Sequence, residues 1–482
     1  MLRAFLKDSV VYAIPTFVSR GLALLLVPLY TRVLNPADIG ALDMLLVFAG
    51  LVNLTIALEV SQGLARCYAE EQDPGRKRAY ASSAFWFTVG CYALFMLLAW
   101  TYSPALSTWV TGQDGLVSAF RIGVFYIGIN GIFYLLQNQF RWELSSRRYA
   151  ETSLLSTGAT AAAAVWFAYG LGWGLSGLLW GMAVGPALGI VYGLWRLRHS
   201  IGATFDRRRL WDMLQFSMPL VPAGLAVWGS AYIDRMMINH FLSLHDVGLY
   251  SVGFRLSSIV ALLVAGVQGA LMPLVFAHHR EPGTPLQLAR IFRVFLACAL
   301  LLFLALSLLA RDILVLMTTP DFYPAAVLVV YLVPAAMLAQ MYIFAPGIGI
   351  AKKSHFYLWL NLVGIAVNGA LGWLLIPAAG ITGAALASLV GSACVFVLAM
   401  ALSQRLYPVP HAWGRMIAAT VVAAVLAVMI PWLAPTDGLR RVSGGLALLV
   451  LAAVLIALGL VRRDELAQAG RELRAVRALS RK

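Results

Sequence analysis

Charged side chains are scarce in this chain. They make up 12% of its 482 residues, whereas hydrophobic residues make up 61%. A soluble protein could not hide that much apolar side chain, so the composition excludes a soluble globular protein. Cysteines are also few. The four of them, Cys67, Cys91, Cys298 and Cys394, lack the spacing of metal ligands, so neither a metal site nor a disulfide framework is predicted.

Long apolar runs are what the sequence has instead. A membrane-spanning helix needs about 20 apolar residues, and about fourteen such segments can be drawn. Helices are required because lipid offers the backbone no hydrogen-bond partner. The sequence therefore predicts an all-α polytopic membrane protein. The expected spans are 10–30, 40–62, 81–102, 118–138, 153–171, 175–195, 214–234, 247–272, 294–316, 325–349, 357–376, 383–403, 417–434 and 443–461.

The net charge of +15 is unevenly distributed along the chain. Most of the 36 lysines and arginines follow even-numbered spans or lie near the two ends. The positive-inside rule turns this bias into a topology in which both termini are cytoplasmic. The basic excess is thus mainly a signal of orientation, with attraction to anionic lipid headgroups as a secondary effect. It gives no reason to expect nucleic acid as a partner.

Three short patterns recur at nearly one offset, 205 to 208 residues later in the chain. The pairs are Leu34–Gly40 with Leu242–Gly248, Arg147-Arg148 with Lys352-Lys353, and Gly174–Gly177 with Gly380–Gly383. A common offset indicates an internal repeat of six spans. In the first pair, Asp38 and Asp246 suit turn or cap positions, and the glycines that follow allow tight backbone geometry or close packing.

The repeat predicts two six-helix lobes of the same orientation, because six spans is an even number. Such halves are related by an axis along the membrane normal, and they can rock against each other around a central cavity. The expected organisation is an N-terminal lobe at 1–200 and a C-terminal lobe at 201–410. An additional helix pair follows at 411–462, and then a cytoplasmic amphipathic tail at 463–482.

The charges that lie well inside spans gather in equivalent helices of the two halves. They are Arg20 in the first span, Asp43 and Glu59 in the second, Asp234 and Arg235 at the end of the seventh, and Arg255 in the eighth. A charge at bilayer depth costs about 2.5 kcal/mol or more, so it normally faces a wet cavity or a partner. A polar cavity shared by the leading helices of two repeated halves is typical of a transporter.

Several stretches carry a resemblance to a known family. They are Ser19-Arg20, Pro28–Leu34, Asp234-Arg235, Gly248–Tyr250 with Arg255, Asn368, Leu374–Pro377 and Gly380–Ser388. In these the chain resembles polysaccharide flippases of the Wzx type, within the multidrug/oligosaccharidyl-lipid/polysaccharide (MOP) exporter superfamily. The resemblance covers the first twelve spans, and the last pair departs from many relatives. It implies two MATE-like lobes with a cavity lined mainly by helices 1, 2, 7 and 8.

The resemblance also implies a substrate, an undecaprenyl-pyrophosphate-linked oligosaccharide. It would be moved from the cytoplasmic to the periplasmic leaflet of a bacterial inner membrane by alternating access, for O-antigen or exopolysaccharide synthesis. Guanidinium groups bind pyrophosphate oxygens bidentately. Arg20 and Arg255 are therefore the expected pyrophosphate anchors, aided by Arg235, with Arg32 at the exit. Membrane lipids and glycan polymerase or export machinery are expected partners, and the protein is expected to be a monomer.

Each interior charge also has a structural alternative. Arg20 can be the buried partner of Glu59 or Asp43, and Asp234 with Arg235 can tie the lobes together. Adjacent residues do not face each other on a helix, so these two are not expected to pair with each other. Asp43 and Glu59 are expected near opposite ends of one helix, about 24 Å apart. Glu59, Asp43 and Asp234 are the candidates to couple transport to H⁺ or Na⁺.

Other functions fit the sequence less well. A lipid II flippase needs the same cavity, so this alternative function remains open. A MATE-like multidrug exporter predicts an acidic and aromatic cavity for cationic drugs, against which the arginines argue. A membrane-embedded glycan polymerase or acyltransferase needs a catalytic constellation, often on a sizeable outer loop, and the longest outer loop, 103–115, has none. The chain is therefore predicted not to be an enzyme, and no catalytic residue, metal or cofactor is expected.

Overall fold

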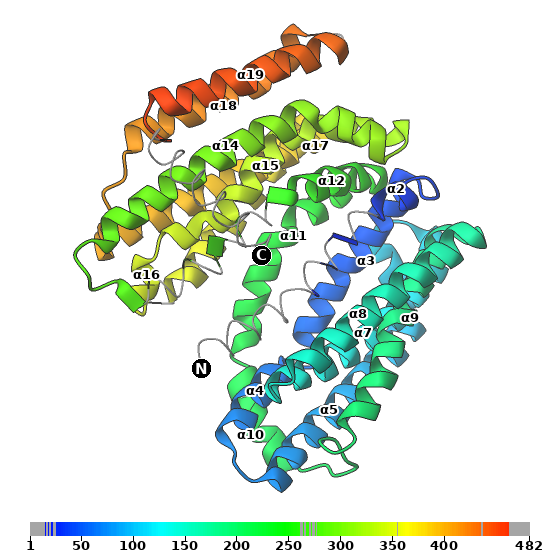
Figure 1. The fold of residues 1–482 in the computed structure, drawn as a ribbon. Helices are drawn as coiled ribbons and strands as arrows, with labels where there is room; N and C mark the ends of the chain where they lie inside the picture. Colours follow the sequence, from blue (N-terminus) through cyan, green and yellow to red (C-terminus); the bar gives the residue numbers. More distant parts are fainter. Residues whose placement is uncertain are drawn as a thin grey trace, which may run out of the picture. The chain divides into compact units, whose positions relative to one another are not determined.

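The computed structural model is built of helices. It describes residues 15, 18, 21–22, 26–260, 264, 267–268, 271, 275, 277–353, 355–434 and 437–461. The chain divides into two compact units, Met1–Ser251 with Met317–Asp321, and Val252–Leu316 with Phe322–Lys482 (Figure 1). Most of the first expected span and the expected tail at 463–482 lie outside the described residues. The described ranges contain no β-strand.

The first unit is a set of long helices that fold back on one another. Its helices are α2 (Val27–Tyr30), α3 (Pro36–Thr55), α4 (Val60–Glu70), α5 (Pro74–Thr101), α6 (Ser103–Thr111), η1 (Asp114–Leu116), α7 (Val117–Trp142), α8 (Ser146–Ala164), the π-helix η2 (Val165–Gly170), α9 (Gly174–Leu197), α10 (Arg207–Ser217) and α11 (Leu220–Phe241). The helix α12 (Leu244–Ser257) begins in this unit. Helix α9 packs along α8 and α7, α10 packs on α4, and α11 packs on α3 (Figure 1).

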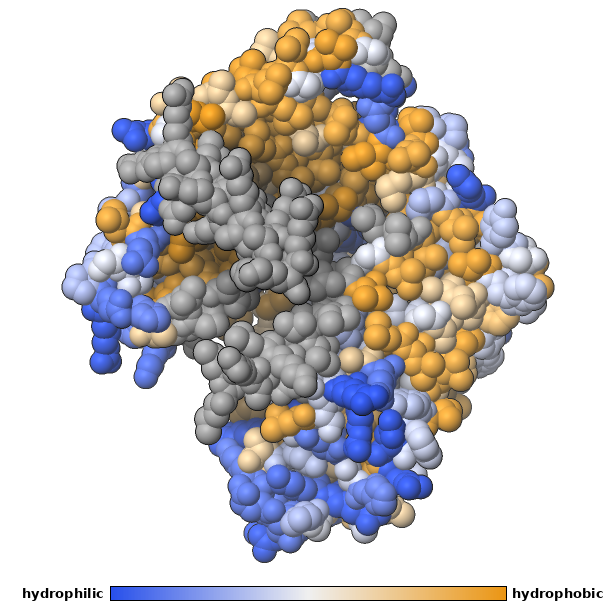
Figure 2. All heavy atoms as spheres, in the orientation of Figure 1, coloured by the Kyte–Doolittle hydropathy of each residue, from blue (hydrophilic) through white to orange (hydrophobic). Residues whose placement is uncertain are grey.

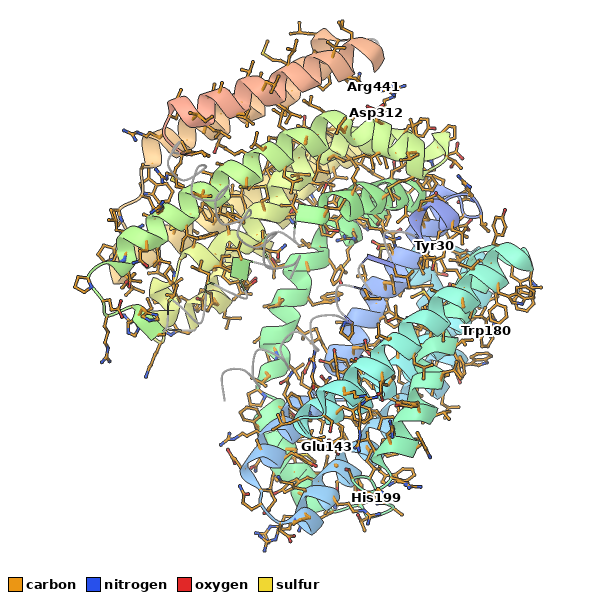
Figure 3. The ribbon with its side chains drawn as sticks, viewed as in Figure 1. Tyr30, Glu143, Trp180, His199, Asp312 and Arg441 are labelled. Carbon is orange, nitrogen blue, oxygen red and sulfur yellow. The ribbon has the colours of Figure 1, made fainter. Side chains whose placement is uncertain are left out.

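The second unit is also built of helices. Its helices are α14 (Thr284–Met317), η3 (Pro320–Ala325), α15 (Ala326–Gln340), η4 (Met341–Phe344), α16 (Gly347–Ile350), α17 (His355–Leu406), α18 (Trp413–Leu433) and α19 (Asp437–Ala457). Helix α15 packs on α17, and α18 packs beside α19. An ion pair of 2.7 Å between Arg441 Nη2 and Asp312 Oδ1 joins α19 to α14 (Figure 3). The expected additional pair is thus α18 and α19.

The all-α polytopic prediction is confirmed, and the count of fourteen spans stays a prediction. Within the described residues, nine helices are long and apolar enough to cross a membrane. A tenth is added when α10 and α11, bent by 47° at Met218-Pro219, count as one span. Proline lacks the N–H that would continue the helix, which accounts for the bend. The expected spans 357–376 and 383–403 both lie in α17, on either side of Gly380, whose backbone is not helical (φ 60°, ψ −142°).

Two of the three repeated patterns occupy equivalent places in the structure. Gly174 and Gly380 both adopt left-handed backbone, with φ of 54° and 60°, at helix junctions that glycine tolerates without strain. The Arg147-Arg148 match is wrong in register. The left-handed residues before α8 and α17 are Leu144 and Lys352, 208 residues apart, so the equivalent of Arg147 is His355.

The compact units do not end where the repeat predicts. The lobe boundary was expected between residues 200 and 201, whereas the first unit extends to Ser251. It does so because α10 packs on α4 and α11 packs on α3, so the leading helices of the second half join the first. The division into repeats of 1–200 and 201–410 stays a prediction, since compactness and repetition are different properties.

Apolar side chains cover the middle of each long helix on its outer side. Leu97 on α5, Val191 on α9 and Leu449 on α19 are all among the most exposed apolar residues. In the first unit, Figure 2 shows polar side chains gathered at the end that carries α10 and the start of α5. An apolar belt with a polar end is the surface expected of a helix bundle in lipid.

His411, between α17 and α18, gives the second unit a pH dependence. Its ring packs edge-on against Phe292 and Trp413, each centroid 5.0 Å away. Neither ring nitrogen has a hydrogen-bond partner among the described residues, and burial lowers the pKa of His411 to about 4.

Because the unfolded chain protonates this ring at a higher pH than the folded chain does, folding loses stability as pH falls from about 6.5 to about 4. We expect His411→Phe to flatten this part of the melting-temperature profile, measured by tryptophan fluorescence in detergent. His199→Phe, at an exposed histidine of the first unit, is the control. Equal slopes in the wild type and His411→Phe would contradict the prediction.

Candidate functional site

The starts of α3 and α12 cross at two glycines. A Cβ added to Gly40 would lie 1.9 Å from the backbone oxygen of Leu244, and one added to Gly248 would lie 1.8 Å from that of Pro36. Pro36 and Gly40 are the repeat equivalents of Leu244 and Gly248, so the contact is symmetric. Close packing, one of the two roles expected for these glycines, is therefore confirmed.

Each crossing helix begins with a side-chain cap, as expected for Asp38 and Asp246. The Asp38 backbone N–H donates to Asn35 Oδ1 at 2.9 Å, and the Asn35 N–H donates to Asp38 Oδ2 at 3.2 Å. This reciprocal pair is a capping box. In the second helix the Ser243 hydroxyl donates to Asp246 Oδ2. The caps fix both helix starts, and with them the residues one turn further on.

Asp43 and Ser251 meet one turn beyond the glycines. They are again equivalent positions of the repeat, and the Ser251 hydroxyl donates to Asp43 Oδ2 at 2.7 Å. The Asp43 side chain keeps only 14% of its exposure, and Ser251 is buried. The crossing therefore holds a carboxylate inside the first unit.

Arg235 of α11 completes a buried charge cluster. Its Nε lies 2.8 Å from Asp43 Oδ2, and its Nη1 lies 3.4 Å from Asp234 Oδ1. The Tyr250 hydroxyl, from α12, donates to Asp234 Oδ2. The guanidinium also faces the rings of Tyr232 and Tyr250, with centroids 5.4 and 5.7 Å from Cζ. We call Asp43, Asp234, Arg235, Tyr250 and Ser251 the α3–α11–α12 cluster.

The α3–α11–α12 cluster contains two carboxylates and one guanidinium. The two aspartates share that guanidinium, whose side chain is 5% exposed. Burying a charge costs several kcal/mol unless it is paired, so Arg235 stabilises both carboxylates.

The sequence predicted three members of the cluster and missed the others. Adjacent residues were not expected to pair, yet Asp234 accepts from the backbone N–H of Arg235 at 2.8 Å as well as facing its guanidinium. The prediction was wrong because a short side chain can fold back toward the next residue. Tyr250 and Ser251 were missed, although the 208-residue offset pairs Ser251 with Asp43.

The expected pyrophosphate anchors are not brought together in the described residues. Arg20 lies outside them. Arg32 is exposed beyond α2, and Arg255 is half-buried on α12 in the second unit. Arg235 is already paired with two carboxylates, which favours its structural alternative. Substrate binding by these arginines stays a prediction.

Glu59 lies apart, in a break in the expected second span. Helix α3 ends at Thr55 and α4 begins at Val60, and both Leu58 and Glu59 adopt left-handed backbone, with φ of 50° and 54°. Such backbone costs a non-glycine residue about 1 kcal/mol or more. One continuous helix carrying Asp43 and Glu59 was therefore the wrong expectation. A carboxylate at an interrupted span is typical of ion sites in transporters.

Among the residues that the structure describes, no group of three or more His, Cys, Asp or Glu side chains is arranged to hold a metal ion. The cysteines are free, and three of them are half-buried.

Comparison with known proteins places the chain in a family. The family described as polysaccharide biosynthesis protein matches residues 29–328, more than half of the chain. The succinoglycan biosynthesis transport protein ExoT of Rhizobium meliloti (strain 1021) is 24% identical over 362 residues, which are 73% of this chain and 71% of that protein.

Solved structures show the same fold. The lipid II flippase MurJ, in an inward closed conformation, matches with a TM-score of 0.71 at 12% identity, over 92% of this chain and 98% of that one. An inward-facing MATE family transporter of the MOP superfamily matches with a TM-score of 0.66 at 15% identity, over 83% and 97%. The chain belongs to the polysaccharide biosynthesis protein family and has the fold of the MOP superfamily, as its resemblance to Wzx-type flippases predicted.

Proposed function

We propose that the protein is a flippase for lipid-linked oligosaccharides in a bacterial inner membrane. The substrate is an undecaprenyl-pyrophosphate-linked oligosaccharide, and it moves from the cytoplasmic to the periplasmic leaflet for surface polysaccharide synthesis. The observation that carries the proposal is the family match over residues 29–328, which includes every described member of the α3–α11–α12 cluster. The similarity to a succinoglycan biosynthesis transport protein supports export of a polysaccharide or its precursor.

The fold supports a mechanism of alternating access. Proteins built from two repeats of the same orientation can expose a central cavity to either side of the membrane. The lipid tail stays in the bilayer, so only the charged head needs a polar path, and crossing bare hydrocarbon would be prohibitive for it. Arg20 and Arg255 hold the pyrophosphate in this proposal, and Arg32 contacts it near the exit.

Ion coupling is assigned to carboxylates of the first unit. Asp43 and Asp234 share one guanidinium inside the first unit, and in this proposal one of these carboxylates takes up a proton or a sodium ion during transport. Glu59, at the break between α3 and α4, is the second candidate. Binding of one ion would favour either the inward-open or the outward-open state, because a bound ligand stabilises the state that binds it better.

Deletion of the gene is the direct test of the substrate. We expect a specific saccharide-lipid to accumulate with its sugar on the cytoplasmic leaflet, and surface polysaccharide to fall. Lipid-linked glycan profiling by mass spectrometry measures the saccharide-lipid pool, and a separate sugar assay measures the surface polysaccharide. Accumulation of lipid II instead would favour the lipid II flippase alternative. Normal export with unchanged lipid pools would contradict a flippase function.

Complementation with variants tests the anchors. Arg255→Ala should reduce export about tenfold or more, because a lost charge-assisted contact to phosphate costs about 1.5–3 kcal/mol, while membrane insertion stays normal. Arg255→Lys should retain part of the activity. Arg66→Ala, which breaks an exposed pair with Glu70, is the control. Full export by Arg255→Ala would remove this residue from the proposed anchor.

A further inference from the structure

A basic pocket lies at the start of α8, away from the α3–α11–α12 cluster. It has a volume of about 420 Å³ and is lined by the turn at 144–146, Arg147, Arg148, Glu151 and Arg196. Arg196 is near the end of α9, which runs back beside α8. Figure 3 shows that Glu143, just before α8, and His199, just after α9, lie at the same end of the first unit.

The pocket has a surplus of positive charge. Its one carboxylate, Glu151, is shared between two arginines, with Arg147 Nε at 2.8 Å from Oε1 and Arg196 Nη2 at 3.3 Å from Oε2. The Tyr192 hydroxyl also donates to Oε2, at 2.7 Å. Arg148 is exposed and forms no ion pair within the part of the chain that the structure describes. Three guanidinium groups against one carboxylate leave a net charge of +2 for an anion.

Backbone donors add to this surplus. Helix α8 is 19 residues long, and its N-cap residue, Ser145, provides no side-chain hydrogen bond to the first turn. The N–H groups of Arg147 and Arg148 are therefore not capped by Ser145, and together with the helix dipole they favour a phosphate or carboxylate. Helix α10 also begins with arginines. There the Asp206 side chain accepts hydrogen bonds from the N–H groups of Arg208 and Arg209, so the start of α10 is capped.

Exposed apolar residues lie beside the pocket, and we call them its apolar rim: Leu144 belongs to the lining, whereas Trp195 and Val191 lie on α9 near the lining residue Arg196. Leu144 adopts left-handed backbone with φ of 54°, and its side chain is 84% exposed. On α9, Trp195 and Val191 are 58% and 68% exposed, and the Trp195 ring lies 5.0 Å from the guanidinium of Arg196. Exposed leucine, valine and tryptophan beside arginine are typical of the interface between acyl chains and headgroups.

We propose that this pocket binds the phosphate of an anionic membrane lipid. Arg147, Arg148 and Arg196 neutralise the phosphate, and Leu144 and Trp195 lie among the adjoining acyl chains. A soluble anion would gain nothing from the apolar rim, so the combination points to a lipid. The site is independent of the proposed transport function, and the charge pattern predicts that it faces the cytoplasm.

The equivalent junction of the second half lacks this combination. Lys352 takes the place of Leu144 as the left-handed residue, and α17 begins with His355 and Phe356 where α8 has Arg147 and Arg148. At this junction the second half has Lys352 and Lys353, so the three arginines that line the pocket are particular to the first half. A site required only by folding of each six-helix unit would be expected in both halves.

Lipid titration of the purified full-length protein in mild detergent tests the proposal. Short-chain phosphatidylglycerol, short-chain phosphatidylcholine and inorganic phosphate are compared, with binding followed by native mass spectrometry and by thermal shift. We expect phosphatidylglycerol to bind, and the double variant Arg147→Ala/Arg148→Ala to weaken it about tenfold or more. Arg148→Gln, at a side chain without an ion pair, should weaken binding without affecting folding.

The matched control is Arg207→Ala/Arg208→Ala, which removes the same charge from the start of α10. It should leave phosphatidylglycerol affinity within about twofold of the wild type. Equal losses in the two double variants would overturn the proposal, because they would show a general effect of charge. Equal binding of phosphatidylcholine, or displacement of phosphatidylglycerol by an equal concentration of inorganic phosphate, would overturn it as well.

Discussion

Replacing Gly248 with alanine is expected to prevent α3 and α12 from crossing as they do. The new Cβ would lie 1.8 Å from the backbone oxygen of Pro36, and 3.1 Å from the backbone nitrogen of Gly40. Backbone atoms at a capped helix start cannot move aside as a flexible side chain can. We expect a loss of about 3 kcal/mol or more, the upper part of the range for overpacking. The measurement is the apparent melting temperature in detergent.

The symmetry of the crossing sharpens this prediction. Gly40→Ala should cost as much as Gly248→Ala, because its Cβ would lie 1.9 Å from the backbone oxygen of Leu244. Each variant forces the same two helices apart, so the double variant should cost less than the sum of the two. Gly90→Ala, at an exposed α5 glycine with no atom within 4 Å of the added Cβ, should leave stability unchanged or raise it slightly. A melting temperature of Gly248→Ala equal to that of Gly90→Ala would show that the crossing is not tight.

The sequence predicted the helices and the repeat more reliably than the breaks. Long apolar runs leave no alternative to helix in lipid, which is why α7 and α9 lie within a few residues of their expected spans. The break at Leu58 and Glu59 has no glycine or proline to announce it, so the pattern could not separate α3 from α4. The break within α17 was predicted, because Gly380 lies between the expected spans 357–376 and 383–403, and its backbone is not helical.

Charges could be identified in the sequence but not grouped. Asp43, Asp234 and Arg235 stood out because charge is costly in a span. Their mutual pairing depends on how α11 packs against α3, which is a tertiary property that no local pattern encodes. The repeat did contain a partial clue. Once Gly40 and Gly248 are seen as equivalents in contact, the next inward positions, Asp43 and Ser251, are expected to meet.

Replacing Arg235 with alanine is expected to be as damaging as the glycine variants, for an electrostatic reason. It would remove the guanidinium that Asp43 and Asp234 share in the interior of the first unit. Removing one partner of a buried ion pair costs about 3–5 kcal/mol, because the remaining charge is uncompensated. The loss should appear as a fall in apparent melting temperature. Arg66→Ala, in a pair that is more than half exposed on both sides, should cost no more than about 0.5 kcal/mol.

The same cluster separates stability from transport. Asp43→Asn leaves one carboxylate for one guanidinium, so it should cost clearly less stability than Arg235→Ala. Combining Asp43→Asn, Asp234→Asn and Arg235→Met removes every charge and should restore much of the melting temperature, since buried ion triads can be replaced by uncharged groups of similar size. If the cluster exchanges an ion during transport, this triple variant folds but no longer responds to an imposed pH or sodium gradient in lipid-linked glycan export. A triple variant that folds and still follows both gradients would assign coupling elsewhere, with Glu59 as the remaining coupling candidate to test by Glu59→Gln.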